Sequence, residues 1–499
     1  MVRLAFATFP NPQYDPITAQ GDEMTGNVEI GKSQGPPMCG SSQMTELFAL
    51  HETDCYEMYS RYCNEQLVGM LRIIGFDVGF CRGEGPYLYD RKETRYLDLL
   101  SGFGVFALGR NHPAVRAALR NVLDSDLPNL VQMGVSRLAG ILAERLLKKV
   151  PHLDKVFFVN SGGEAVEAAM KFARAATGRP GIIYCDHAFH GLSYGALSIN
   201  GDETFRSGFG PFLPDCIRVP FNDLPALEKA LDVGTVAAFI VEPIQGEGVN
   251  MPSADYLKSA ADLCHRYGAL FIADEIQTGL GRTGRFLAVE HWNVEPDMVL
   301  LSKALSAGYI PVSAVLTRKH VFDKVFNRVD RAMVAASTFS ENNLAMAAGI
   351  ATLDVLALEG LVEKAASTGE RLMRAFSEMA ARYELVREVR GKGLMIGIDF
   401  GRPRSFNLRT SWDLIEAARE GLFSQVITIP LFTDHKILCQ VAGPGSHAVK
   451  FLPPLTISDS DCEWIINAVE AVIAASHRVP GAAWSLGKRL VANLVRTRS

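Results

Sequence analysis

Short apolar runs alternate with helical patterns through the middle of the chain. Between the runs, segments such as 164–176 and 254–268 carry apolar residues at helical spacing. Near-continuous apolar strands separated by helices indicate a mostly parallel sheet that is covered by helices on both faces. The pattern therefore predicts an α/β domain with strands at KVFFVNS (155–161), GIIYCD (181–186), VAAFIVEPI (236–244), ALFIADEI (269–276) and MVLLSK (298–303).

The flanking regions follow other patterns. Residues 45–74 have the apolar spacing of a helix, and residues 85–100 alternate like a β-hairpin with DRKET as its turn. From about Leu356 a long helix precedes VREVRGKGLMIGIDF (386–400) and AVKFLPPLTIS (448–458), which is typical of a smaller α+β domain.

A chain of 499 residues exceeds what one hydrophobic core usually supports, so more than one domain is expected. The first residues are rich in Gly, Pro, Ser and Gln without periodicity, which is typical of a mobile arm. We predict a mobile arm (1–45), an N-terminal segment of the small domain (46–104), a large domain (105–355), a C-terminal small-domain segment (356–478) and a basic amphipathic tail (479–499).

Composition and charge exclude several classes of protein. With 50 Lys and Arg against 55 Asp and Glu, the net charge of −5 offers no global attraction to nucleic acid. No apolar run approaches a membrane span, and the apolar stub before Pro10 is too short for a signal peptide. Nine scattered cysteines without a C-x-x-C pair argue against a disulfide framework or a metal site. We expect a soluble, cytoplasmic enzyme.

Two charged residues close apolar strands, where ligands of open α/β sheets gather. Lys303 ends MVLLSK, and desolvation there would lower its pKa, as an imine-forming lysine requires; the alternative is an exposed lysine after a strand. Asp274 ends ALFIAD and is either a helix cap, a metal ligand or a partner of the pyridine nitrogen of pyridoxal phosphate.

A candidate anion site follows the first strand. In NSGGEAVEAAMKFA (160–173), Ser161 and Glu164 have the spacing of a capping box. Gly162 and Gly163 allow backbone N–H groups to approach an anion at the positive end of the helix. The alternative is a plain N-cap, but two glycines in a first turn cost helix stability, which favours phosphate binding.

Seven motifs occur together in one order, over about Gly83–Ser476: SGFGVFALGRNHP, NSGGEA, AFHG, VEPIQGEG, LFIADEIQTGLGRTG, LLSKALSAG and STF. The chain thereby resembles the class III aminotransferases, which include ornithine, acetylornithine, 4-aminobutyrate and putrescine aminotransferases. The resemblance implies a fold-type-I pyridoxal 5'-phosphate enzyme, with a large domain on a seven-stranded, mostly parallel sheet and a smaller α+β domain from the N- and C-terminal segments.

The resemblance also implies roles for residues around the cofactor ring. Lys303 matches the Schiff-base lysine, and Asp274 matches the partner of the pyridine nitrogen. Phe189 matches the aromatic residue stacked on the ring, and Gln277 matches the glutamine near the phenolic oxygen. Glu242 matches a strand-end glutamate of the site.

Other matches concern the phosphate and the oligomeric state. Ser161, Gly162 and Gly163 match the phosphate site at a helix start. Thr338 matches the threonine that reaches the phosphate of the neighbouring subunit, which implies an obligate homodimer with shared active sites.

The sequence ADEIQTGLGRTGRF (273–286) contains G-x-G-x-x-G at Gly279, Gly281 and Gly284. A dinucleotide fingerprint joins a strand directly to a helix, but here EIQT intervenes and RTGRFLAVEHW lacks a clean amphipathic pattern. We therefore interpret the stretch as a loop, which in the resembled family lies near the active site and the subunit boundary.

Two departures from the family bear on the substrate. Where ornithine and acetylornithine members commonly hold carboxylates with two arginines, this chain has Leu192 and Lys450. An arginine fork binds a carboxylate through two hydrogen bonds, whereas lysine offers a point charge. We therefore count Leu192, Lys450 and Glu247 of VEPIQGEG as candidate substrate residues. The segment LFTDHKILCQVAG (431–443) is longer than usual and is expected to reshape the entrance.

These observations predict an aminotransferase that works through a Lys303 Schiff base and a pyridoxamine phosphate intermediate. The expected partners are a donor such as glutamate and a terminal amine or aldehyde, either diamine-like or on a larger apolar molecule such as a hopanoid-type lipid. An acetylornithine or ornithine aminotransferase is the alternative, as is a decarboxylase, racemase or aminomutase of the same fold.

The last twenty residues form a separate feature. Trp484, Leu490, Val491, Leu494 and Val495 give an apolar stripe next to Lys488, Arg489, Arg496 and Arg498. Such a tail either lies on an anionic membrane, packs on its own domain as a helix, or is solvated.

Overall fold

The computed structural model describes residues 55–478 together with Gly481, Trp484, Leu486 and Gly487. The predicted mobile arm (1–45) lies outside the described residues, as do residues 46–54 and most of the tail. The chain divides into two compact units, 1–62 and 63–499. In the first unit the structure describes the helix α2 (Cys55–Tyr62), and the elements below belong to the second unit.

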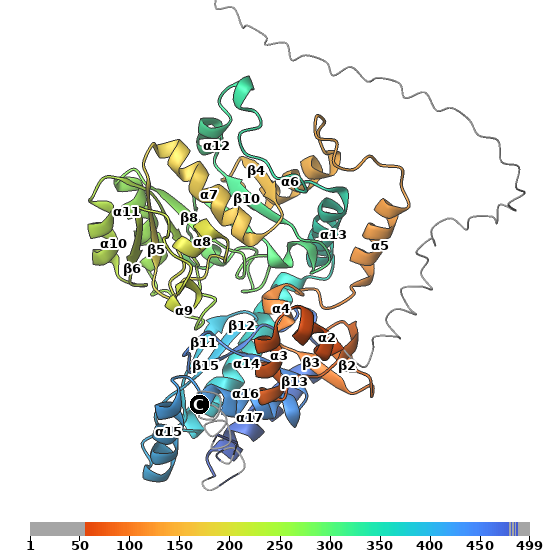
Figure 1. Ribbon diagram of the computed structural model, residues 1–499, viewed down its shortest axis with the longest axis vertical. Helices are drawn as coiled ribbons and strands as arrows, with labels where there is room; N and C mark the ends of the chain where they lie inside the picture. The colour runs from red at the N-terminus through yellow and green to blue at the C-terminus, as the bar shows by residue number, and fades with distance from the viewer. Residues whose placement is uncertain (1–54, 479–480, 482–483, 485, 488–499) are drawn as a thin grey trace, which may run out of the picture. The chain divides into compact units, whose positions relative to one another are not determined.

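The largest sheet has seven strands in the order β4-β10-β9-β8-β7-β5-β6 (Figure 1). β10 is antiparallel to both of its neighbours, and the other neighbouring pairs are parallel. The predicted mostly parallel sheet is thus confirmed. Its strands are β4 (Lys155–Val159), β5 (Gly181–Cys185), β6 (Cys216–Val219), β7 (Val236–Val241), β8 (Leu270–Asp274), β9 (Met298–Leu301) and β10 (Ser313–Thr317).

Helices connect and cover these strands. Many begin at side-chain caps, as predicted for Ser161, whose hydroxyl accepts from the Glu164 N–H. In this part of the chain they are α4 (Ser101–Gly104), α5 (Pro113–Leu123), α6 (Arg137–Lys149), α7 (Gly162–Thr177), α8 (Tyr194–Ser198), α9 (Glu203–Arg206), α10 (Leu224–Leu231), α11 (Tyr256–Arg266), α12 (Lys319–Val325) and α13 (Asn343–Leu358), with 3-10 turns η1 (Ala288–Trp292), η2 (Lys303–Ser306) and η3 (Val329–Arg331).

Both faces of the large sheet are buried. On β7, Phe239 and Val241 belong to a hydrophobic cluster that includes Leu257 of α11. Ile240, which points the other way, belongs to a second cluster with Phe172 of α7. Alternate residues of one strand thus enter separate cores, which explains why the strands read as continuous apolar runs.

Two smaller sheets come from the ends of the chain. The predicted hairpin at 85–100 is confirmed, since β2 and β3 pair antiparallel. One sheet has the order β1-β2-β3-β13 and the other β11-β12-β15-β14. Their elements, with the adjoining helices, are α3 (Glu65–Ile74), β1 (Phe80–Glu84), β2 (Tyr87–Asp90), β3 (Arg95–Asp98), α14 (Leu361–Arg382), β11 (Val386–Lys392), β12 (Met395–Phe400), α15 (Phe406–Ala418), α16 (Phe423–Thr433), β13 (Ile437–Leu438), β14 (Gln440–Val441), β15 (Ala448–Phe451) and α17 (Asp459–Ser476).

The helix predicted over 45–74 is interrupted. α2 ends at Tyr62 and α3 begins after Asn64, whose side chain accepts a hydrogen bond from the Leu67 N–H at 3.0 Å. An asparagine that caps a new helix ends the preceding one, because its own backbone is extended (φ −146°).

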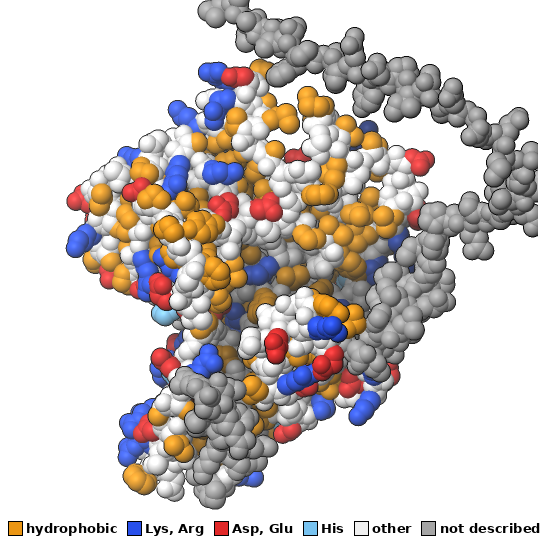
Figure 2. Space-filling view, in the orientation of Figure 1, with side chains coloured by type: hydrophobic (Ala, Val, Ile, Leu, Met, Phe, Trp, Pro, Cys, Tyr) orange, Lys and Arg blue, Asp and Glu red, His pale blue; other side chains and the backbone are white. Residues whose placement is uncertain are grey.

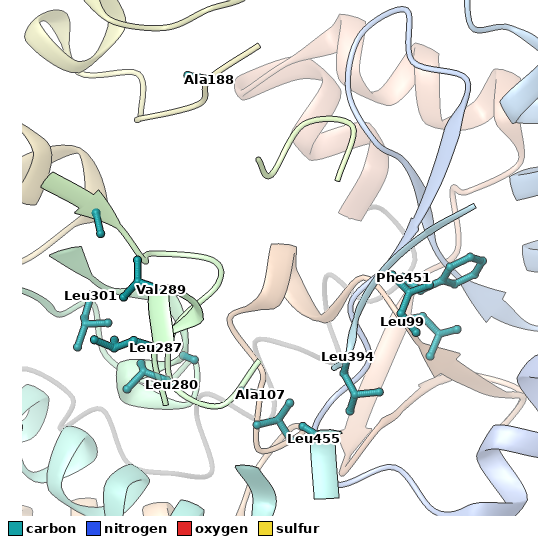
Figure 3. Packing of buried hydrophobic residues seen from close by; sticks show 14 of the residues in the cluster. Leu99, Ala107, Ala188, Leu280, Leu287, Val289, Leu301, Leu394, Phe451 and Leu455 are labelled. Carbon is teal, nitrogen blue, oxygen red and sulfur yellow. The ribbon is translucent and has the colours of Figure 1, made fainter. Parts of the chain in front are cut away.

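The large sheet and the smaller sheets share one hydrophobic cluster. In Figure 3, Leu280, Leu287, Val289 and Leu301 form one group beside the large sheet. Leu99, Leu394, Phe451 and Leu455 form a second group on the strands and loops of the smaller sheets. The loop 275–287 lies between strand β8 and η1 and carries Leu280 and Leu287 of this cluster.

The glycines of G-x-G-x-x-G lie in that loop, and a 3-10 turn rather than an α-helix follows it. Gly281 and Gly284 have positive φ angles of 90° and 81°. An added Cβ would lie 3.2 Å from Val362 and 2.8 Å from Ala366, both on α14. The glycines therefore allow the loop to pack closely against a helix.

Within the described residues, no single helix has both the length and the apolar content to cross a membrane, although α13 and α14 pass that test as a pair bent by 61°. Of the apolar stripe in the tail, Trp484 alone is described. It is 3% exposed, and its indole N–H donates to the Ser476 carbonyl at 2.8 Å. This residue packs on its own domain, while the rest of the stripe lies outside the described residues.

Candidate active site

A cavity of about 220 Å³ lies at the carboxyl ends of β7, β8 and β9. It brings together residues from five separate sequence motifs. Four of the residues predicted from the sequence do not line it: Ser161, Leu192, Thr338 and Lys450. Eight of them do: Gly162, Gly163, Phe189, Glu242, Glu247, Asp274, Gln277 and Lys303.

Asp274 and His190 form a buried pair in the cavity wall. Asp274 Oδ2 lies 2.7 Å from His190 Nδ1, and Oδ1 accepts from the Ile276 N–H at 3.1 Å. Burial alone would lower the pKa of His190, but the hydrogen bond to Asp274 and the charges of Asp274 and Glu242 raise it overall. The geometry thus pairs an imidazole nitrogen directly with a carboxylate in the interior.

Glu242 follows β7 directly and is also buried. Its two oxygens accept from the Phe189 N–H at 3.0 Å and from the Gly246 N–H at 2.8 Å. Burial raises the pKa of Glu242 to about 7; the charge of His190 opposes the rise, and that of Asp274 adds to it. The side chain therefore fixes the backbone on either side of the cavity.

Lys303 begins η2 with a φ of 38°, in the left-handed region. Such a conformation costs a non-glycine residue about 1–3 kcal/mol and is kept where the surroundings impose it. Here Ser302 Oγ donates to the Val312 carbonyl at 3.3 Å and accepts from Ser313 Oγ at 2.5 Å. Burial lowers the pKa of the Lys303 amine, against the opposing charges of Asp274, Glu242 and Glu247.

The start of α7 meets the cavity at two glycines. An added Cβ at Gly162 would lie 3.0 Å from Ile276, and one at Gly163 would lie 3.1 Å from Ser193 Oγ. Ser161 caps the helix from the exposed side. The first N–H groups of a 16-residue helix therefore face the cavity without side chains in between, a geometry suited to an anion.

Lys450 on β15 lies behind the opposite wall and is 3% exposed. Its Nζ donates to the Gly246 carbonyl at 2.6 Å and to Gln277 Oε1 at 3.4 Å. Gln277 in turn donates to the Phe103 carbonyl at 3.1 Å. Burial lowers the pKa of Lys450 to about 8; the charge of Glu247 opposes this, and the charge of Lys303 adds to it.

Glu247 joins this end of the cavity to the long segment 431–443. Its Oε2 is buried and lacks a hydrogen-bond partner among the described residues. An added Cβ at Gly443 would lie 1.8 Å from that oxygen, and the Gly248 N–H donates to the Ala442 carbonyl at 2.6 Å. Burial raises the pKa of Glu247. The segment expected to reshape the entrance thus ends against a cavity residue.

Leu192 and Thr338 lie toward the surface, whereas Phe189 lines the cavity. Leu192 follows the lining residue Gly191 and is 57% exposed. Phe189 meets Phe205 edge-on, with ring centroids 5.3 Å apart. Thr338 is exposed, and its carbonyl accepts from Gln132 Nε2 at 3.3 Å.

Comparison with known families decides the identity. The model of the family described as aminotransferase class-III matches residues 76–473, which include every element of the cavity. The chain belongs to the class III aminotransferase family. This aminotransferase is 34% identical over 452 residues to the aminotransferase PigE of Serratia sp. (strain ATCC 39006). The match covers 84% of the chain and 53% of PigE, so the chain spans about half the length of that relative.

Solved structures show the same fold. The ornithine aminotransferase from Toxoplasma gondii ME49 superposes with a TM-score of 0.75 at 30% identity, covering 86% of this chain and 97% of that one. An amine transaminase from an uncultivated Pseudomonas species, in its PLP-bound form, gives a TM-score of 0.69 at 30% identity, covering 80% and 94%. The class III aminotransferase is therefore a PLP-dependent enzyme.

The residues present fit this cofactor. The cavity offers a buried carboxylate for a ring nitrogen (Asp274), a lysine of lowered pKa (Lys303) and an aromatic ring (Phe189). A helix start bare of side chains at Gly162 and Gly163 suits a phosphate.

His190 is a site residue for which the sequence analysis gave no role. It stands in the quoted motif AFHG, but its partner Asp274 is 84 positions away. The signal in the sequence that could have identified His190 was its position directly after Phe189, the predicted stacking residue. Only the fold shows that the imidazole turns toward the carboxylate.

Proposed function

We propose that this aminotransferase moves an amino group between a donor such as glutamate and a terminal amine or aldehyde that lacks an α-carboxylate. The observation that supports this proposal most is that no arginine is found among the described residues that line the cavity. Leu192 cannot bind a carboxylate, and Lys450 already donates to Gly246 and Gln277. A second carboxylate on the substrate would therefore meet one point charge instead of an arginine fork.

The surface beyond the cavity favours an apolar substrate over a short diamine. Leu192 is 57% exposed, Tyr194 51% and Phe209 62%. Figure 2 shows hydrophobic side chains on this face of the molecule, over the region of α8. Apolar surface next to a cavity suits the chain of a larger amine, of which a hopanoid-type lipid is one example.

Pyridoxal phosphate supplies, when bound, an electron sink for negative charge at the substrate carbon. In this proposal Lys303 Nζ carries the cofactor and, once displaced by the substrate amine, takes a proton from that carbon and returns it. Asp274, oriented by His190, holds the proton of the pyridine nitrogen. When the cofactor is bound, Phe189 would stack on its ring, and Gln277 would be near the phenolic oxygen.

The remaining assignments complete the proposed site. Gly162 and Gly163 donate their backbone N–H groups to the phosphate, and Ser161 holds the helix start in place. Glu242 orients the backbone of Phe189. Lys450 provides the charge for the donor's carboxylate, with Glu247 beside it.

A screen of half-reactions tests the proposed substrate class. The loaded enzyme is mixed with ornithine, acetylornithine, 4-aminobutyrate, putrescine or long-chain terminal amines, and the conversion of bound cofactor to pyridoxamine phosphate is followed by absorbance. We expect stoichiometric conversion with the terminal amines. Selective conversion by ornithine or acetylornithine would contradict the proposal and favour the function in the names of the structural neighbours.

We also propose a homodimer with shared active sites. Apolar residues crowd the surface of two segments, 127–135 and 329–339. Val135 is 98% exposed, Met133 89% and Val329 95%. Both segments line a cavity of about 540 Å³. An exposed apolar surface of this kind usually marks an interface, and a second copy of the chain is the proposed occupant.

The second of these segments also adjoins the start of α7. Ser337 Oγ accepts from Asn160 Nδ2 at 2.6 Å, and Thr338 follows. In the proposed dimer Thr338 reaches the phosphate of the partner subunit. Mixing an inactive Lys303→Ala variant with an inactive Thr338→Val variant should then restore one intact site per mixed dimer. Absence of activity despite proven subunit exchange would count against shared sites.

Two predictions from the sequence stay proposals. We propose that residues 105–355 form the cofactor-binding domain and that residues 46–104 and 356–478 form the small domain. We further propose a cytoplasmic location. The eight described cysteines are all free thiols, which is the state that a reducing compartment maintains.

A further inference from the structure

Arg282 is a buried arginine in the loop between Asp274 and η1. It is 2% exposed, among the largest fully enclosed side chains of the described protein. Its Nη1 donates to the Leu394 carbonyl at 3.1 Å and to the Pro453 carbonyl. Its own carbonyl accepts from the Leu394 N–H at 2.9 Å. One residue thus fixes the loop to two other segments of the chain.

The charge of Arg282 is not compensated by a carboxylate. Within the described part of the chain no charged group acts on the guanidinium, and Nη2 has no hydrogen-bond partner there. Burial lowers the pKa of Arg282 to about 9. Burying a charge without a counter-ion is costly, so a packing role alone would be served better by an apolar side chain.

The carbonyls of Leu394 and Pro453 belong to segments next to Lys450, the residue proposed to bind substrate. Leu394 precedes β12, which pairs with β15, and the pairing places Gly397 opposite Lys450. Pro453 follows β15 by two residues. The loop that carries Arg282 also carries Gln277, which accepts from Lys450 Nζ at 3.4 Å. Arg282 and Gln277 therefore contact the same strand region from one loop.

The backbone confirms how closely these segments approach. An added Cβ at Gly393 would lie 2.3 Å from the Thr283 carbonyl carbon, so the turn before β12 rests directly on the residue after Arg282. Figure 3 shows Leu280 and Leu287, on either side of Arg282 in the sequence, in one group, and Leu394 and Leu455 in the other. Arg282 links them by a hydrogen bond from its place between Leu280 and Leu287 in the sequence to the Leu394 carbonyl.

We propose that Arg282 is a positioning residue that sets the distance between the Gln277 loop and strand β15, and thereby the place of Lys450 behind the cavity wall. The proposal rests on the substrate role proposed for Lys450. Both carbonyls accept from Nη1, a terminal nitrogen of the guanidinium. A lysine side chain at the same position ends one bond short of that nitrogen, so its ammonium cannot hold both carbonyls at the same distances. A displacement of about 1 Å in a binding group is enough to change rates or affinities by about tenfold or more.

A double-variant cycle tests the proposal. Arg282→Lys, Lys450→Met and the double variant are compared, with Arg285→Lys as the matched control because Arg285 is an exposed arginine of the same loop. We expect Arg282→Lys to raise KM for the amino donor about tenfold with a much smaller change in kcat. In the Lys450→Met background the same change should have almost no further effect on KM.

Hydrogen exchange gives a readout that does not depend on turnover. Exchange of peptides that cover 394–396 and 448–453 should be faster in Arg282→Lys than in Arg285→Lys, with or without cofactor. A lowered Tm with unchanged KM would show a structural role only and overturn the proposal, as would additive effects of the two substitutions. If Lys450→Met itself leaves KM unchanged, the substrate role of Lys450 is wrong and the proposal fails with it. An Arg282→Met variant that fails to fold would not decide the question. Arg282→Lys keeps the positive charge and therefore remains the variant that tests the proposal.

Discussion

The two ends of the cavity are built in different ways. At the cofactor end, Glu242, Asp274 and Lys303 each stand at or directly after the end of a strand of one sheet. At the proposed substrate end, Glu247 comes from a loop and Lys450 from a different sheet. The residues proposed for the cofactor stand in the family motifs, whereas Leu192 and Lys450 stand where the resemblance leads us to expect arginines.

The difference follows from the architecture. Strand ends are fixed by ladder hydrogen bonds and by two hydrophobic cores, so groups placed there keep their geometry. Loops tolerate exchange more readily than strand ends, because ladder hydrogen bonds do not hold their residues. In the proposed function the strand ends thus carry the chemistry, and the residues around Lys450 select the substrate.

Loss of Lys303 is expected to have the largest effect. A Lys303→Ala variant removes both the group that carries the cofactor and the one that moves the proton, so turnover should fall by at least about 10⁴-fold. The visible absorbance of the bound cofactor should change as well. Lys258→Ala, an exposed lysine on α11, is the control and should retain full activity.

Changes at the Asp274–His190 pair come next. Asp274→Asn cannot hold a proton on the ring nitrogen by charge, so kcat should fall by about 10²–10³-fold. His190→Ala keeps the carboxylate but removes its partner at 2.7 Å, and a smaller loss is expected. Equal losses in both variants, measured as kcat at saturating donor and acceptor, would show that the pair acts in another way than proposed.

The substrate end should instead respond to pH. Burial lowers the pKa of Lys450 to about 8, so its positive charge is present below that pH and disappears above it. KM for an anionic donor should then rise about tenfold per pH unit above 8. Lys450→Arg stays charged throughout and should remove this rise. A wild-type KM that is flat between pH 7 and 9.5 would contradict the assignment.

The sequence predicted the fold and eight of the residues that line the cavity, for a physical reason. Buried parallel strands are apolar on both faces, and charged residues at their ends stand out against that background. β10 and β6 were missed. SAVLT is an apolar run as long as several predicted strands, so its pattern was a signal that went unused, whereas CIRV is an edge strand in which Arg218 is exposed. His190 and Arg282 took their roles only from the fold, since their partners are 84 and 112 or more positions away.

The central claim is that the cofactor end is that of an aminotransferase and the substrate end selects amines without an α-carboxylate. The most direct measurement is the ratio of kcat/KM for a long-chain terminal amine to kcat/KM for ornithine, in the wild type and in a Leu192→Arg, Lys450→Arg double variant. The account predicts a wild-type ratio above about 10 and a fall of at least about tenfold in the double variant, because an arginine fork then binds the carboxylate. A wild-type ratio below one, unchanged in the variant, would contradict it.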